Sequence, residues 1–181
     1  LKGLARTSKI HYTLVFDSSL SMKCKSGDST RFDAAREFAR QLFTDVDTES
    51  TVDLFVFDRE THRINDKPVA ARDCGPLLEG IQCSYALTNV TSMTKPISSA
   101  IEEAASNGYR CRTYIFSDMA ASAWNVPNSS AGTAFVESLK KISESGELFL
   151  VDCSGGNKRN HAIVSFMPSR GTFCIGLDTL M

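Results

Sequence analysis

The sequence has no long apolar run and no surplus of charge of one sign. Its apolar runs are short, such as Leu54–Phe57 and Leu148–Val151, whereas a helix that crosses a bilayer needs about 20 apolar residues. Its 20 Lys and Arg residues nearly balance its 21 Asp and Glu residues, so it lacks the clustered positive charge that binds nucleic acid. We therefore expect a segment that contacts neither nucleic acid nor a membrane directly.

The cysteines lack the spacing of a metal site. There is no Cys-x-x-Cys pair and no nearby pair of histidines, which argues against zinc. A chain of 181 residues can build a core without cross-links, so mostly free thiols are the simpler interpretation. The alternative is a disulfide framework, in which Cys74 and Cys83 are the most plausible pair. The six cysteines are residues 24, 74, 83, 111, 153 and 174.

The sequence begins without Met and without a basic-then-apolar leader. With 42% hydrophobic and 23% charged residues it has the composition of an ordinary globular protein, and its length suits one domain. We expect residues 1–181 to form a single domain excised from a longer chain.

Hydrophobic periodicity predicts strands that alternate with helices. Near-continuous runs of β-branched and aromatic residues predict strands that are covered on both faces, and apolar residues at every third or fourth position predict helices. Such an alternation is typical of an α/β fold with a parallel sheet. The predicted strands are Ile10–Phe16, Thr51–Phe57, Thr61–Ile64, Cys111–Phe116, Glu147–Val151 and Ala162–Phe166. The predicted helices are one that begins after Thr30, one from Pro96 to Ser106 and one from Thr133 to Ser143.

Local signals refine this pattern. Thr30 with Asp33 three residues later resembles a capping box at the start of the first helix. The turn residues 58–60 connect the second and third strands. Residues 65–94 contain Pro68, Gly75 and Gly80, which predict no long element there.

Oxygen-bearing side chains gather where the predicted strands end. The first strand is followed by Asp17, Ser19 and Ser21 in an Asp-x-Ser-x-Ser pattern, and the Cys111–Phe116 strand is followed by Asp118. In open α/β sheets ligands bind beyond the carboxyl ends of the strands. Oxygen-only ligands suit Mg²⁺ or Mn²⁺, and neutral hydroxyls leave the ion able to accept an anion. The competing interpretation is that Asp17 and Ser19 only stabilise a turn.

A threonine cluster precedes the helix at Pro96. Its members are Thr88, Thr91 and Thr94, and each offers a further hydroxyl. We choose Thr94 as the fifth ligand, with Thr91 as the second choice. The predicted metal ligands are Asp17, Ser19, Ser21, Thr94 and Asp118.

The residues Asp17–Met22, Arg31-Phe32-Asp33 and Phe116-Ser117-Asp118 together resemble a von Willebrand factor type A domain. The resemblance covers nearly the whole chain. It implies a Rossmann-like α/β fold with a mostly parallel central sheet, one antiparallel edge strand and helices on both faces. It also implies that the oxygen cluster is a metal-ion-dependent adhesion site. Departures from the family pattern are Lys95 after Thr94 and Met119 where glycine is commoner.

A narrower resemblance is to bacterial membrane-anchored proteins of the aerotolerance type. It depends on Ser122-Ala123-Trp124, on Val151-Asp152-Cys153 and on residues 160–164. It implies a membrane-associated parent protein, and it leaves the compartment open.

Three hypotheses of function follow. The first is a non-enzymatic module whose Mg²⁺ or Mn²⁺ accepts an Asp or Glu of a partner protein. The second is a Mg²⁺-dependent phosphoryl-transfer hydrolase with Asp17 as nucleophile, although Ser19 stands where such enzymes need a second carboxylate. The third is a scaffold that keeps the fold without a metal. His11, His62 and His161 are scattered, which favours structural roles over a catalytic one.

Overall fold

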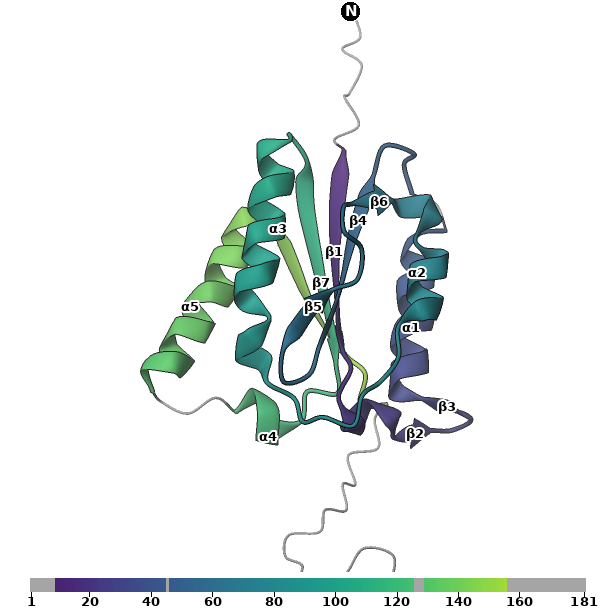
Figure 1. Ribbon diagram of the computed structural model, residues 1–181, viewed down its shortest axis with the longest axis vertical. Coiled ribbons are helices and arrows are strands. Elements are labelled where there is room, and N and C mark those ends of the chain that lie inside the picture. The colour runs from purple at the N-terminus through teal and green to yellow at the C-terminus, as the bar shows by residue number, and fades with distance from the viewer. Residues whose placement is uncertain (1–8, 45, 126–128, 156–181) are drawn as a thin grey trace, which may run out of the picture.

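The computed structural model describes residues 9–44, 46–125 and 129–155 (Figure 1). Its centre is a sheet with the strand order β5-β4-β1-β7-β8, and β6 also pairs with β4. Strands β4, β1, β7 and β8 run parallel, whereas β5 and β6 are antiparallel to β4. The mostly parallel α/β sheet with an antiparallel edge is therefore confirmed, and the short β6 adds a second antiparallel pairing.

The bounds of the longer strands follow the hydrophobic pattern closely, whereas those of the helices differ from it by a few residues. The strands are β1 (Ile10–Asp17), β2 (Lys25–Ser26), β3 (Ser29–Thr30), β4 (Thr51–Phe57), β5 (Thr61–Arg63), β6 (Val69–Ala70), β7 (Arg110–Ser117) and β8 (Glu147–Asp152). The α-helices are α1 (Arg31–Leu42), α2 (Gly75–Gly80), α3 (Thr94–Ser106), α4 (Ala121–Trp124) and α5 (Ser130–Ser145). The 3-10 helices are η1 (Leu20–Lys23), η2 (Ala71–Asp73) and η3 (Val90–Ser92). The predicted strand Ala162–Phe166 lies outside the described residues.

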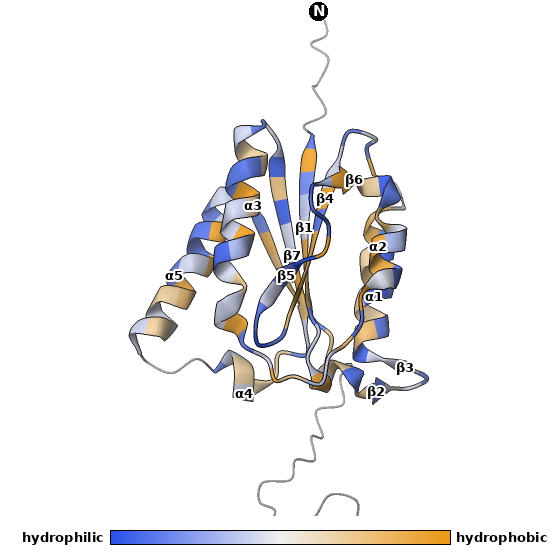
Figure 2. Cartoon of the chain, in the orientation of Figure 1, coloured by the Kyte–Doolittle hydropathy of each residue, from blue (hydrophilic) through white to orange (hydrophobic). Residues whose placement is uncertain are grey.

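Strand β1 separates two apolar layers because alternate side chains point to opposite faces of a sheet. Leu14 and Phe16 pack in one layer with Phe32 and Ala35 of α1. Val15 packs in the other layer with residues of α3 and α5. Figure 1 shows α1 and α2 on one side of the sheet and α3 and α5 on the other. Figure 2 shows hydrophobic residues along the central strands β1 and β4, while β5 is hydrophilic and the helices carry both kinds.

Helix α1 begins where the sequence predicts. The Thr30 side chain accepts a hydrogen bond from the backbone N–H of Asp33, and the Asp33 side chain accepts one from the backbone N–H of Thr30. This reciprocal capping box satisfies two backbone donors that the first turn leaves without helical partners.

The five described cysteines are free thiols, Cys74 and Cys83 included. This agrees with the simpler interpretation of the cysteine pattern, and the alternative pairing of Cys74 with Cys83 is not formed. Among the described residues no helix is both long and apolar enough to cross a membrane.

Neighbouring strands β1 and β7 direct the chain to opposite faces of the sheet. The connection after β1 leads into α1, and the connection after β7 leads into α4 and α5, which lie on the other side in Figure 1. A crevice opens at such a switch point beyond the carboxyl ends of the two strands. Asp17 and Asp118 stand at those two ends.

Candidate metal centre

Asp17 is the last residue of β1 and is completely buried. Its Oδ1 accepts a hydrogen bond from the backbone N–H of Ser19 at 3.0 Å and lies 3.5 Å from the Thr88 hydroxyl. Its Oδ2 accepts a hydrogen bond of 2.8 Å from the Ser117 hydroxyl. These donors, from three different segments, hold the carboxylate in one orientation.

The two serines of the Asp-x-Ser-x-Ser pattern lie side by side. The Oγ atoms of Ser19 and Ser21 are 3.2 Å apart, because η1 turns the chain tightly between them. Met22 is fully buried beneath this turn. The backbone N–H of Leu20 donates to the carbonyl of Ala86 at 3.1 Å, which ties the serine loop to the segment that contains Thr88.

Asp118 is held by an arginine. Arg31 Nη1 donates to Asp118 Oδ2 at 2.7 Å and lies 3.3 Å from the backbone oxygen of Ser21. The Asp118 Oδ1 atom accepts a bond of 3.2 Å from the backbone N–H of Ala120. Arg31, the first residue of α1, therefore connects the loop after β1 with the loop after β7.

Met119, next to Asp118, has a φ of 51°. This left-handed conformation favours glycine and costs a residue with a Cβ about 1 kcal/mol. Backbone strain of this kind concentrates at functional sites, and here it accompanies the turn that aims Asp118.

Of the three candidate threonines, Thr88 approaches Asp17. Thr91 donates its hydroxyl proton to the side chain of Asn89 at 2.7 Å, and Thr94 Oγ1 donates to the Thr91 carbonyl at 3.4 Å. Thr94 forms no hydrogen bond with the other four predicted ligands in the described part of the chain. The geometry favours Thr88 over Thr94, and the choice of Thr94 as ligand stays a prediction.

The electrostatics of the cluster favour a cation. Burial raises the pKa of the Asp17 carboxyl above its ordinary value, and the negative charge of Asp118 adds to this rise, while hydrogen bonds from Ser19 and Ser117 oppose it. No Lys or Arg pairs with Asp17 within the described residues, whereas Asp118 has Arg31. A positive charge beside Asp17 would stabilise its ionised form.

The donor set fits a hard divalent ion. The described residues contain no cluster of three or more His, Cys, Asp or Glu side chains suited to a metal, so an ion here depends on hydroxyl oxygens. Carboxylate and hydroxyl oxygens are ligands that Mg²⁺ and Mn²⁺ accept. The Arg31 guanidinium already pairs with Asp118 and neutralises the charge of that carboxylate, so Asp17 is the carboxylate whose charge is left for an ion.

Two hollows border the cluster. One of about 390 Å³ is lined by Ser19, Ser21, Leu87 and Thr88 among others, and one of about 380 Å³ is lined by Arg31, Asp118 and their neighbours. Leu87 is 73% exposed at the rim. The surface around the oxygen cluster is therefore open to a partner.

Ser117, Thr88 and Arg31 were not among the predicted ligands, although they contact those ligands. The alternation of side chains along a strand could have indicated Ser117. Ile115 of β7 pairs with Val15 of β1. Two residues further along each strand, Ser117 and Asp17 therefore point to the same face at the same end of the sheet. Trp124 also takes part, since its Nε1 donates to Ser117 Oγ at 3.0 Å while its ring meets Phe135 edge-on.

We compared the sequence and the fold with those of known proteins. A family model described as the von Willebrand factor type A domain matches residues 12–121. No curated protein matches the sequence. The manganese-loaded TRAP protein of Plasmodium vivax has a TM-score of 0.57 at 11% identity, covering 87% of this chain and 66% of that one. A mutant PilB minor pilin from Streptococcus sanguinis has a TM-score of 0.51 at 15% identity.

The chain spans only 30% of that pilin's length, and the match covers 62% of this chain. An aerotolerance-related membrane protein from Bacteroides fragilis has a TM-score of 0.48 at 12% identity, covering 81% of this chain and 93% of that one. At such identities these likenesses concern the fold alone. The narrower resemblance to the aerotolerance type stays a prediction.

Proposed function

The chain belongs to the von Willebrand factor type A family, and from this premise we propose that it is a divalent-metal-dependent protein-interaction module. The observation that supports the proposal most directly is the buried Asp17 carboxylate, which lies beside Ser19 and the Thr88 hydroxyl and pairs with no Lys or Arg among the described residues. The partner supplies the carboxylate of an Asp or Glu, and the module itself has no catalytic role.

Each residue has a distinct part in holding the ion. Asp17 supplies negative charge, and Ser117 and the Ser19 N–H fix the direction of its oxygens. Ser19, Ser21 and Thr88 supply neutral oxygens. Asp118 balances charge from the far side, with Arg31 setting its position. A bound Mg²⁺ or Mn²⁺ would supply Lewis acidity toward an incoming carboxylate.

Manganese allows a direct test, because protein-bound Mn²⁺ that keeps a water ligand strongly enhances water proton relaxation. We expect enhancement with the unaltered chain, and we expect added acetate to reduce it by displacing that water. Asp17→Asn should weaken Mn²⁺ binding at least about tenfold, since it removes the principal charge.

Asp28→Asn is the matched control, because Asp28 is exposed in the nearby loop and outside the cluster. Ser21→Ala provides a milder change at a half-buried ligand, in case Asp17→Asn alters folding. Unchanged relaxation in the unaltered chain at millimolar Mn²⁺ would refute the proposal.

One observation favours a second candidate, a scaffold without metal. The ion pair between Arg31 and Asp118 already neutralises one carboxylate of the site. For a phosphoryl-transfer hydrolase the structure offers no such support, because Asp17 is fully buried and accepts hydrogen bonds at both oxygens. The manganese titration separates the module from the scaffold.

A further inference from the structure

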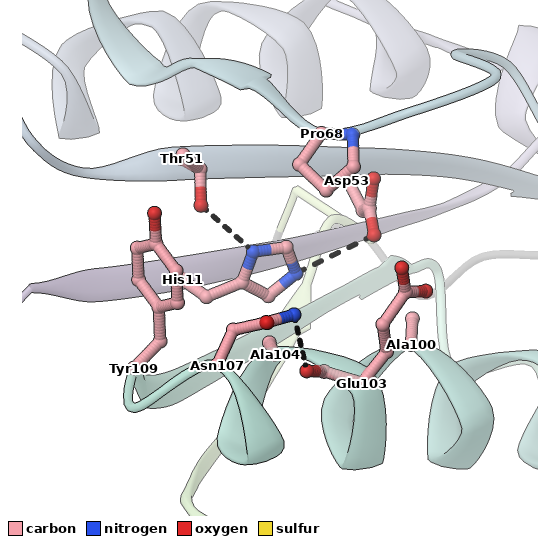
Figure 3. A pocket seen from close by; sticks show the side chains of 9 residues that line it. All are labelled: His11, Thr51, Asp53, Pro68, Ala100, Glu103, Ala104, Asn107 and Tyr109. Carbon is pink, nitrogen blue, oxygen red and sulfur yellow. Dashed lines mark hydrogen bonds and ion pairs between the residues drawn. The ribbon is translucent and has the colours of Figure 1, made fainter.

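A second polar site lies at the opposite end of β1 from Asp17. It is a pocket of about 410 Å³, within the size range of small-molecule sites. Figure 3 shows its lining, in which His11 lies between Thr51 and Asp53 of β4 and the last turns of α3. His11 is six residues before Asp17 on the same strand, which separates the two sites by about 20 Å.

The floor of this pocket is a buried polar pair. His11 and Asp53 are each 1% exposed. The Nδ1 atom of His11 is 3.0 Å from Thr51 Oγ1, whereas its Nε2 atom is 3.5 Å from Asp53 Oδ2 and has no hydrogen-bond partner in the described part of the chain. Buried polar atoms rarely stay without a partner, because their desolvation costs free energy.

Asp53 is supported mainly through its other oxygen. Arg63 donates to Oδ1 at 2.7 and 3.2 Å, and Asn65 donates to the same atom at 3.0 Å. Burial raises the pKa of Asp53, but its interactions with the neighbouring His11 and Arg63 side chains outweigh this and hold the pKa below its ordinary value, so the carboxylate is ionised. The Oδ2 atom is left facing His11 Nε2 across the pocket floor (Figure 3).

The two facing atoms can share a donor. When His11 Nδ1 carries the proton and donates it to Thr51, Nε2 becomes an acceptor. Nε2 and Asp53 Oδ2 are then two facing acceptors with no proton between them to form a hydrogen bond. A ligand with several N–H groups satisfies both at once.

The rim and walls give the charge and shape of that ligand. Glu103 adds a second carboxylate, and no Lys or Arg of the described residues lines the pocket, although Arg63 bonds to Asp53 Oδ1 from outside the lining. Pro68, Ala100 and Ala104 supply apolar walls. The lining is therefore negative at its polar end and apolar beside it.

From these features we propose that the pocket binds the guanidinium or ammonium group of an aliphatic cation. The N–H groups bond to His11 Nε2 and Asp53 Oδ2, and the carbon stem lies against Pro68, Ala100 and Ala104. This chemistry belongs both to free alkylguanidines and amines and to the Arg or Lys side chain of a peptide. The site is independent of the metal cluster.

The test is a titration of the ¹⁵N-labelled chain, followed by NMR in excess chelator. The first probe is butylguanidinium, and its uncharged counterpart of similar shape is N-butylurea. We expect saturable shifts at His11, Ala104 and Tyr109 with butylguanidinium and binding at least about tenfold weaker with N-butylurea. A third probe, an acetylated and amidated Gly-Arg-Gly peptide, distinguishes a peptide side chain from a free ligand, and binding of either guanidinium probe supports the proposal.

Glu103→Gln should weaken butylguanidinium binding about threefold to fivefold, as expected for one exposed charge. The control is Glu102→Gln, which changes an exposed neighbour on α3 outside the lining. Asp53→Asn should abolish binding, and its folding is checked by the shift pattern because Arg63 loses its partner. Equal binding of N-butylurea, equal affinity in Glu103→Gln, or no shift at His11 with either guanidinium probe would overturn the proposal.

Discussion

Arg31 places a positive charge inside the site that is proposed to attract a metal. Its side chain is 13% exposed and that of Asp118 is 4% exposed, so their attraction is only weakly screened by water. Arg31 must therefore either repel an incoming dication or release Asp118 to it. In both cases the arginine opposes metal binding.

We predict that Arg31→Met strengthens Mn²⁺ binding by about tenfold, roughly 1.4 kcal/mol, because it removes a like charge and frees Asp118 Oδ2. Isothermal titration calorimetry measures the change. Arg36→Met is the control, since Arg36 pairs with Asp33 on the same helix and away from the cluster. Weaker binding in Arg31→Met would instead mean that the arginine's contact with Ser21 organises the loop.

A second prediction at this scale concerns the threonines. Thr88→Ala should weaken Mn²⁺ binding about threefold to tenfold, because it removes a hydroxyl that lies 3.5 Å from Asp17 Oδ1. Thr94→Ala should leave the affinity unchanged, since the Thr94 hydroxyl donates to the Thr91 carbonyl. The same titration compares the two variants, and a larger effect at Thr94 would restore the choice made from the sequence.

Part of the site was predictable from single residues. Asp17, Ser19 and Ser21 are spaced two residues apart, and a tight turn brings such residues close together. The hydroxyls of Ser19 and Ser21 are 3.2 Å apart, as this spacing predicts. Which threonine lies near Asp17 was not predictable, because residues 88, 91 and 94 carry the same hydroxyl at equal spacing. Only the path of the chain, tied by the bond from Leu20 to Ala86, brings Thr88 to Asp17.

Between elements, the chain passes close to β7 at Gly146, where α5 ends and β8 begins. A Cβ added there would lie 2.5 Å from the backbone oxygen of Cys111 on β7. A backbone atom cannot move aside as a flexible side chain does. The glycine therefore allows the chain to pass β7 closely before it pairs as β8.

We predict that Gly146→Ala lowers the free energy of unfolding by about 1–3 kcal/mol, as overpacking does elsewhere. Gly80→Ala, at the end of α2, is the control because an added Cβ there meets nothing within 4 Å. Urea denaturation gives both values. Equal stability of the two variants would show that the α5–β8 connection adjusts freely.

The elements were predictable where the local signals are strong. At α1 the helical periodicity agrees with a capping box, and at β4 a nearly continuous hydrophobic run marks the strand. Helix α3 begins at Thr94 rather than Pro96, because the first turn donates no helical N–H and tolerates proline at its third position. Helix α5 begins at Ser130, three residues before the predicted start, where the Ser129 side chain caps Gly132. The short α2 was not predicted, because Gly75 and Gly80 favour a break, although the proline at residue 76 suits a first helical turn.

Across the whole molecule, the parallel sheet carries polar groups at both ends of its central strand. Asp17 and His11 are each at most 1% exposed, yet both belong to β1, whose middle is wholly apolar on one face. Two helical layers cover the apolar centre and leave the strand ends to loops. The sequence predicted this arrangement at the carboxyl end, where a motif marks it, and not at the amino end, where His11 and Asp53 are far apart in sequence.

Burial in the core also controls the reactivity of the described cysteines, which are free thiols. Burial raises the pKa of Cys74 from its ordinary value of 9.0 to about 11, and that of Cys83 and Cys153 to about 12. Cys24 is exposed. Since the thiolate is the reactive form, a rise of two units reduces it about a hundredfold at pH 8.

We therefore predict that iodoacetamide at pH 8 modifies Cys24 first and modifies Cys74, Cys83 and Cys153 at least about a hundredfold more slowly. The experiment uses a Cys174→Ser chain, because Cys174 lies outside the described residues, and peptide mapping by mass spectrometry follows each site. In urea the thiols should react at similar rates, which shows that folding and not local sequence protects them. A peptide in which Cys74 and Cys83 are joined, or rapid labelling of Cys74 in the native chain, would contradict the free and buried state of these thiols.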